Sequence, residues 1–139
     1  MLSRIFSTAM LFLMLTTGNA LHADPTQFVV QLTREDNNGG HRRALMQIAR
    51  VLKDVGTEKV NFTVVAYEFG ITSLLENNES TATLVAGLNR QGVVFKACKI
   101  SMSASGLTED DFPIEVEFVA AGAPEMINLR LKGFQYWHP

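Results

Sequence analysis

Short apolar runs of strand length alternate with apolar stripes of helical spacing along most of the chain. Residues 28–33, Phe-Val-Val-Gln-Leu-Thr, predict a buried strand. A polar loop at residues 34–40 follows it. Residues 41–55 then predict a helix that ends at Gly56, because apolar side chains recur on one face of this segment. The side chains on that face are Leu45, Ile48, Ala49, Leu52 and Val55.

The same alternation continues to the end of the chain. Further strands are predicted at residues 59–67, 93–97, 115–120 and 134–137. Helices are predicted at residues 71–76, 80–90, 99–105 and 124–132. Ser80 is the expected N-cap of the second of these, and Pro124 is expected in the first position of the last. A capping box from Thr108 to Asp111 predicts one further helical turn. Alternating strands and helices favour an α/β fold, a single-domain open parallel sheet of about five strands with helices on both faces.

Residues 1–23 have the order of a secretory signal peptide. Arg4 precedes an apolar run at residues 5–15, and small and polar residues continue to Ala23. Cleavage is expected near Ala20 or Ala23. The alternative is a transmembrane anchor, but this run of about 11 residues is short against the roughly 20 that cross a bilayer. We therefore expect an exported protein with one domain at residues 24–139.

The domain expected after cleavage is mildly acidic. Without Arg4, 11 basic and 14 acidic side chains remain, which gives a net charge of −3. Nucleic-acid binding would show as a basic excess or stripe, so we expect no nucleic-acid partner. No second long apolar run follows the first, and we expect no membrane association after cleavage.

Cys98 is the only cysteine of the chain, so no intramolecular disulfide can form. Exported domains of this size often carry paired cysteines. A single thiol in an oxidising compartment is a liability unless it is buried or used. Both interpretations stay open at this point, because cysteine is also among the most buried residue types.

Ligands of open parallel sheets bind beyond the carboxyl ends of the strands. The segments expected there are residues 34–40, 68–70, 98–103 and 121–124. Cys98 is the strongest nucleophile among them, and the free amides of the helix that follows it favour its thiolate. Lys99 adds positive charge, and the hydroxyls of Ser101 and Ser103 are candidate donors to a bound anion.

Other polar residues at these strand ends give weaker signals. Asn38 lies in an Asn-Asn-Gly-Gly loop before a helix, where backbone amides can bind an anion. Glu68, which with Gly70 follows the second strand, is a candidate general base. His41 starts a helix, where a solvent-facing histidine is expected more often than a catalytic one. Because His41 and His138 have no partners at metal-ligand spacing, we expect no metal and no other cofactor.

Four stretches together resemble the DsrE/DsrF-like family, in particular its exported single-domain members. The stretches are residues 28–33 with the helix at 44–56, residues 64–70, residues 92–98, and residues 122–125 with the ending Gly-Phe-Gln-Tyr-Trp-His-Pro at 133–139. The resemblance covers residues 28–139 and implies a flavodoxin-like fold and homo-oligomers. In sulfur-relay members a cysteine at the matching strand end carries sulfur as a persulfide, and the resemblance implies that role for Cys98. The Glu-Phe-Gly turn at 68–70 departs from the small Gly/Pro-rich turn of many members.

Two functions of different classes follow. The first is an exported sulfur-handling protein of the periplasm, which carries or transfers sulfur through a persulfide on Cys98. Its partners would be a sulfur donor or a small thiol or anionic ligand, and further copies of the chain. The alternative is a non-catalytic periplasmic module that binds a small ligand or a protein, with a structural Cys98. A redox sensor that forms an intermolecular disulfide is a third, weaker option. The candidate substrate-binding residues are Lys99, Ser101, Ser103, Glu68, Gly70 and Asn38.

Overall fold

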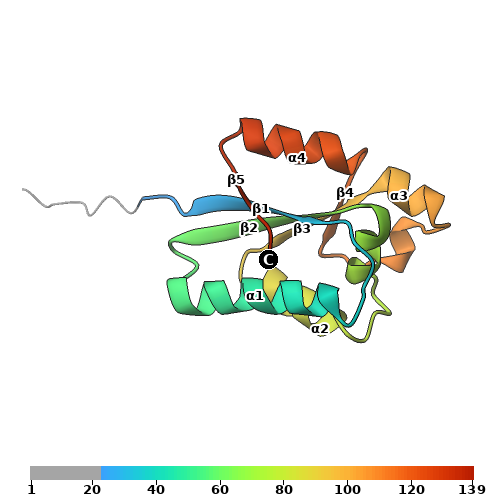
Figure 1. Ribbon diagram of the computed structural model, residues 1–139, viewed down its shortest axis with the longest axis horizontal. Helices are drawn as coiled ribbons and strands as arrows, with labels where there is room; N and C mark the ends of the chain where they lie inside the picture. Colours follow the sequence, from blue (N-terminus) through green and yellow to red (C-terminus); the bar gives the residue numbers. More distant parts are fainter. Residues whose placement is uncertain (1–22) are drawn as a thin grey trace, which may run out of the picture.

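A computed structural model describes residues 23–139, and the expected signal peptide lies almost entirely outside the described residues. Five strands form one parallel sheet in the order β4-β3-β2-β1-β5 (Figure 1). Their bounds are β1 Thr26–Leu32, β2 Val60–Ala66, β3 Val94–Cys98, β4 Val116–Val119 and β5 Gln135–Trp137. All five predicted strands are therefore present, each within a few residues of its predicted bounds.

Helices cover both faces of the sheet, as the alternation of elements predicts. In Figure 1, α1 (Gly40–Val55) and α2 (Ala82–Asn89) lie below the sheet, and α4 (Gly122–Leu131) lies above it. Three helices are short: the 3-10 helix η1 (Glu68–Leu74) follows β2, α3 (Lys99–Ala104) follows β3, and the 3-10 helix η2 (Glu109–Asp111) lies between α3 and β4. The predicted fold class is confirmed as an α/β, flavodoxin-like, single-domain fold. None of the helices at residues 23–139 is long and apolar enough to cross a membrane.

The core has two parts because successive residues of a strand point to opposite faces of the sheet. The larger part is packed against α1 and α2 and contains Phe62, Phe95, Leu45 and Ile48, all fully or almost fully buried. The smaller part, under α4, consists of Val29, Val65, Met126 and Leu129. The face of the sheet under α4 therefore has the smaller apolar core, and polar side chains are found on it.

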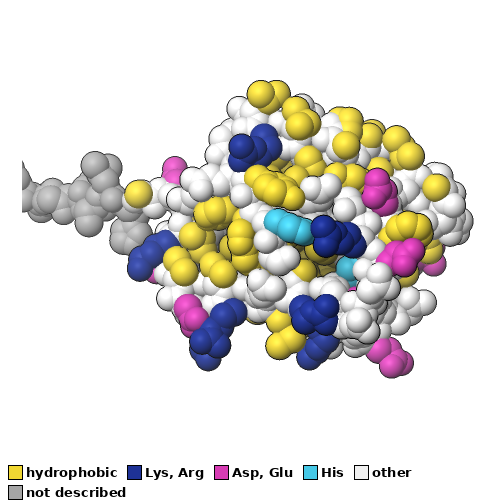
Figure 2. Space-filling view, viewed as in Figure 1, with side chains coloured by type: hydrophobic (Ala, Val, Ile, Leu, Met, Phe, Trp, Pro, Cys, Tyr) yellow, Lys and Arg dark blue, Asp and Glu magenta, His cyan; other side chains and the backbone are white. Residues whose placement is uncertain are grey.

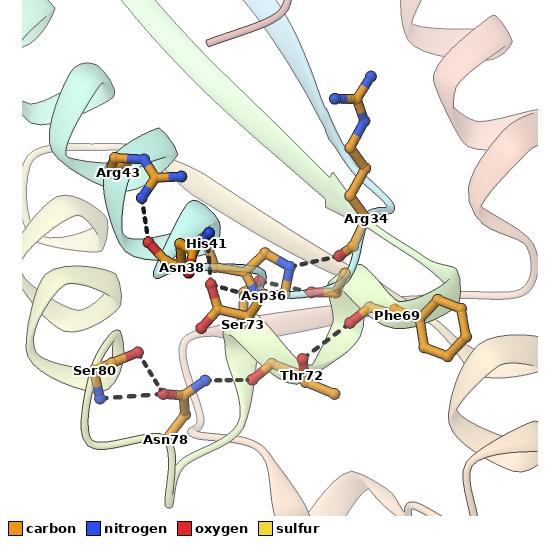
Figure 3. A network of polar contacts seen from close by, with 11 residues as sticks. Arg34, Asp36, Asn38, His41, Arg43, Phe69, Thr72, Ser73, Asn78 and Ser80 are labelled. Atoms are coloured by element: carbon orange, nitrogen blue, oxygen red, sulfur yellow. Dashed lines mark hydrogen bonds and ion pairs between the residues drawn. The ribbon is translucent and has the colours of Figure 1, made fainter.

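Several helix starts differ from the predicted ones. The capping box of Thr108 and Asp111 is confirmed. Ser80 is not the N-cap of α2, because its amide and hydroxyl both bond to the side chain of Asn78 and the helix begins at Ala82 (Figure 3). Pro124 is the third residue of α4 rather than the first, since the backbone turns helical at Gly122.

Gly70 fixes the start of η1 against the end of β1. The N–H of Tyr67 donates to the Leu32 carbonyl at 3.0 Å, and Gly70 closes the next turn by donating to the Tyr67 carbonyl at 3.0 Å. A Cβ at Gly70 would overlap that same Leu32 carbonyl. Backbone rather than side chain blocks the position, so the overlap can be relieved only by moving η1 or β1.

We expect Gly70→Ala to lower the free energy of unfolding by about 1–3 kcal/mol, the usual cost of forcing extra volume into a packed site. Gly87→Ala is the control, because a Cβ there has no neighbour nearer than 3.9 Å. Gly87 lies within α2, where alanine stabilises a helix by about 0.5–1 kcal/mol. Urea denaturation of both variants tests the pair, and equal stability of the two would refute the packing argument.

Candidate functional site

Parallel pairing brings the carboxyl ends of β1, β2 and β3 to one edge. Leu32 pairs with Ala66, and Ala66 pairs with Ala97. The residues that follow, Tyr67 after β2 and Cys98 at the end of β3, therefore share this edge. Cys98 is the last residue of β3 and the N-cap residue of α3, and it is only 3% exposed.

The sulfur of Cys98 lies among hydrogen-bond donors. Backbone N–H groups of Ser101, Gly122 and Ile100 and the Ser101 hydroxyl bond to it. Burial by itself raises the pKa of Cys98, but these hydrogen bonds together stabilise the thiolate more strongly, so the pKa lies below that of an ordinary cysteine. The site therefore lowers the pKa of a thiol that is shielded from solvent.

Ser101 is oriented by a second contact. Its Oγ accepts the backbone N–H of Glu68 at 2.7 Å, which leaves its own hydrogen to donate to Cys98. Glu68 has a left-handed conformation with φ of 51°, which is uncommon for a residue other than glycine. Glu68 is the first residue of η1, and it has this conformation while its N–H donates to Ser101 of α3.

Gly122 supplies a donor from the opposite side. It is the first residue of α4, shortly after the end of β4, and a Cβ at this position would lie 2.6 Å from the ring of Tyr67. Glycine therefore lets the first turn of α4 approach both the ring and the thiol. Close by on the same face, Lys96 of β3 forms an ion pair with Glu125 of α4 at 2.6 Å, and both side chains are 19% exposed. This pair holds the start of α4 against β3.

Tyr67 connects the edge of the sheet that carries Cys98 to β1 and β5. Burial, and to a smaller extent the charge of Glu68, raises the pKa of Tyr67. Its hydroxyl accepts a hydrogen bond from the side-chain amide of Gln31, and the Tyr136 hydroxyl donates to the oxygen of that amide at 3.2 Å. An open hollow of about 420 Å³ lies beside these groups and is also lined by Met126 and Ile127 of α4.

The predicted site residues divide into two groups. Ser101 is at the thiol, Glu68 reaches it through its backbone amide, and Gly70 shapes the turn next to it. Lys99 instead forms an exposed ion pair with Glu109 at 2.7 Å, and it is not among the groups that shift the pKa of Cys98.

Ser103 and Asn38 also lie apart from the bonds to the thiol. Ser103 is exposed on α3. Asn38 precedes α1, and its carbonyl accepts a hydrogen bond from Arg43. Neither residue is among the groups that bond to Cys98. The predicted solvent-facing orientation of His41 is wrong, because that side chain is buried.

Three contributors were not predicted from the sequence: Tyr67, Gly122 and Gln31. Gly122 falls within residues 121–124, which the strand-end rule selects, but a backbone donor carries no residue-type signal. Groups of three or more metal-ligating side chains are absent from the described residues 23–139.

The fold and this edge define an α/β protein with a flavodoxin-like parallel sheet and a buried, hydrogen-bonded thiol at the end of a central strand. The DsrE/DsrF-like family model matches residues 27–138, and the chain belongs to this family, which is associated with sulfur relay.

Two solved structures share the fold. A protein of unknown function from Methanobacterium thermoautotrophicum, MTH1491, has a TM-score of 0.71 and 27% identity and covers 84% of this chain and 100% of its own. The ychN protein from E. coli has a TM-score of 0.60 and 13% identity, with the same coverages of 84% and 100%, and supports the fold alone. The chain has no match among curated proteins.

We expect Ser101→Ala to raise the pKa of Cys98, because the thiolate loses a hydrogen bond. Hydrogen bonds to charged groups contribute about 1.5–3 kcal/mol, which corresponds to about one to two pKa units. Thiolate absorbance during a pH titration measures this shift without requiring access to the sulfur, with Cys98→Ala as the blank.

Ser103→Ala is the matched control, because it removes an exposed hydroxyl from the same helix. The pKa of Cys98 is lower in the folded chain than in the unfolded one. The resulting stability is therefore present above the unfolded pKa and is lost as the pH falls through the folded value. Ser101→Ala should weaken this pH dependence of unfolding, and an unchanged titration would remove Ser101 from the site.

Proposed function

We propose that this is an exported sulfur-handling protein that carries sulfur as a persulfide on Cys98. The observation that carries the proposal is the thiol at the end of β3, whose pKa is lowered by donors from α3 and α4. Membership of a family associated with sulfur relay supports it. The N-terminal sequence supports export to the periplasm, and N-terminal sequencing of periplasmic protein should find a first residue just after Ala20 or Ala23.

The chemistry needs only a thiolate and a donor that contains sulfane sulfur. The Cys98 thiolate attacks the outer sulfur of a persulfide or of thiosulfate, and a new S–S bond forms while the donor's S–S bond breaks. A thiol or sulfite leaves with the electron pair of that bond, so no outside oxidant is required. The groups that donate to the Cys98 sulfur stabilise the attacking thiolate, and in the product the negative charge moves to the transferred outer sulfur.

Burial limits when this reaction can take place. With the residue only 3% exposed, a donor reaches the sulfur after the edge formed by η1 and the first turn of α4 opens. A persulfide formed there is then shielded from other thiols until the acceptor binds. This shielding suits carriage of sulfur better than rapid turnover.

Incubation of the folded protein with thiosulfate or a polysulfide should add the mass of one sulfur atom at Cys98. Cys98→Ser should show no such gain, because its hydroxyl is not ionised at neutral pH. Intact mass spectrometry, followed by release of the added mass with a reducing thiol, identifies the product. A wild-type thiol that stays unmodified until the protein unfolds would contradict sulfur carriage.

That contrary result would favour the second candidate, a ligand- or protein-binding module with a structural Cys98. The burial of Cys98 is the observation that favours it. In that case Cys98→Ala would mainly lower stability, by about 1 kcal/mol or somewhat more.

Homo-oligomers belong to the same proposal. The outer side of α4 exposes Leu131 at 81% and Ile127 at 61%, and Tyr136 of β5 is 46% exposed. Figure 2 shows hydrophobic side chains gathered along the upper edge of the molecule, where α4 lies in Figure 1. Apolar side chains grouped on one helix are typical of a subunit contact.

We expect the double change Ile127→Glu with Leu131→Glu to dissociate the oligomer, because four or more charges would meet in an apolar contact. Met46→Glu is the control, since Met46 is 49% exposed but lies on α1. Size-exclusion chromatography with light scattering gives the mass of each. A wild type that is monomeric at all concentrations, or a double variant of unchanged mass, contradicts this contact.

A further inference from the structure

Two of the three elements that enclose the Cys98 sulfur are anchored in the larger core. Ile71 of η1 and Met102 of α3 are both buried there. η1 and α3 are also joined to each other, because the N–H of Glu68 donates to the Ser101 hydroxyl at 2.7 Å. Movement of either element would disturb buried apolar contacts, so these two sides of the enclosure are held firmly.

The third side, the first turn of α4, has no such anchor. The buried apolar side chains of α4 are Met126 and Leu129, and both pack in the smaller core with Val29 of β1 and Val65 of β2. Neither strand is β3, which carries the thiol. The two residues that follow Gly122 are exposed. Apolar packing therefore holds the later turns of α4 over β1 and β2 and leaves its start to other contacts.

An ion pair holds this start against β3. Lys96 lies two residues before Cys98 on β3, so both side chains point to the face that α4 covers. The Nζ of Lys96 is 2.6 Å from a carboxylate oxygen of Glu125, and each side chain is 19% exposed. Within residues 23–139 this is the one side-chain hydrogen bond between α4 and the sheet. Glu117 of β4 also faces Lys96, but at 3.7 Å and with 60% of its side chain exposed.

Opening on the α4 side would leave most donors of the sulfur in place. Movement of the first turn away from β3 withdraws the N–H of Gly122 from the sulfur. The donors of Ser101 and Ile100 stay, because both residues belong to α3. Opening on the α3 side would instead remove those donors as it gave access. The α4 side is therefore the side from which a reagent meets a sulfur that is still hydrogen-bonded.

We propose that the ion pair of Lys96 with Glu125 is a gate for Cys98, which keeps the first turn of α4 closed over the sulfur and admits a reagent when it breaks. The gate controls access to the sulfur and not its ionisation. Loss of the pair leaves the closed form as the major one, because Met126 and Leu129 still hold the rest of α4. The gate rests on the proposed function for its biological use, but its test needs no sulfur donor, so each proposal can fail alone.

The rate at which iodoacetamide, a small neutral reagent, labels Cys98 measures the opening. At a pH where the thiol is fully ionised, Glu125→Ala should be labelled about tenfold faster than wild type or more, since opening no longer breaks a hydrogen bond between charged groups. Thiolate absorbance should give the same titration midpoint for both proteins. Glu117→Ala is the matched control, because it removes a carboxylate that faces the same lysine from β4 instead of α4. Its labelling rate should equal that of wild type.

The dependence of labelling on urea separates the gate from unfolding of the whole chain. Local opening exposes little surface, so the labelling rate should change little with urea below the unfolding transition, whereas labelling through global unfolding rises steeply. Hydrogen exchange gives an independent signal. The amide of Gly122 should exchange faster in Glu125→Ala than in wild type, while the amide of Val65 in the central strand β2 changes far less.

Lys96→Met tests the pair from the other side. It keeps the length of the side chain without its charge, and it should also speed labelling. The double variant with Glu125→Ala should be labelled no faster than the faster single variant, because both changes remove the same contact. A wild-type labelling rate in Glu125→Ala, an equal acceleration in Glu117→Ala, or labelling that follows global unfolding in urea would overturn the proposal.

Discussion

Parallel pairing of β2 with β3 is the constraint on which the site around Cys98 depends. The register that sets Ala66 opposite Ala97 places Tyr67 beside Cys98. A shift of one residue would turn Cys98 to the opposite face, into the core between the sheet and helices α1 and α2, because side chains alternate along a strand. Lys96 would shift with it and lose its ion pair with Glu125. The hydrophobic residues Phe95 and Ala97 of β3, which belong to the core on one face of the sheet, therefore fix the position of a polar site on the other face.

The state of the thiol is a tertiary property of three elements. Its donors come from α3 and from the first residue of α4, and η1 orients the Ser101 hydroxyl through the amide of Glu68. Each of these elements is short or begins at the site, so none could hold a donor alone. Gly122 and Gly70 permit the close approaches that bring them together. A change at either glycine would alter the geometry around the sulfur without touching the sulfur itself.

The sequence predicted the features of the structure that follow from the pattern of hydrophobic and polar residues. Hydrophobic periodicity predicted five strands and the helices between them, and the strand-end rule selected Cys98, Ser101 and residues 121–124. Prediction from the sequence failed where backbone groups or residues distant in sequence determine where a side chain lies. Lys99 was expected at the thiol but pairs with Glu109, since a helix start leaves a long side chain free to turn outward. His41 was expected to face solvent, but the Arg34 carbonyl, seven residues before it, gives its ring a buried partner. Nothing local in the sequence marks either contact.

The pairing of the first strand with the last affects how the chain can fold. β1 lies between β2 and β5, and Val29 pairs with Tyr136 near the end of the chain. During synthesis β1 can pair with β2 early, but its other edge stays open until β5 has been made. Contacts this distant in sequence form slowly, and an open edge is prone to wrong pairing with other chains. A shortened chain that lacks β5 would keep this edge exposed, so aggregation rather than loss of the thiol chemistry would be its first defect.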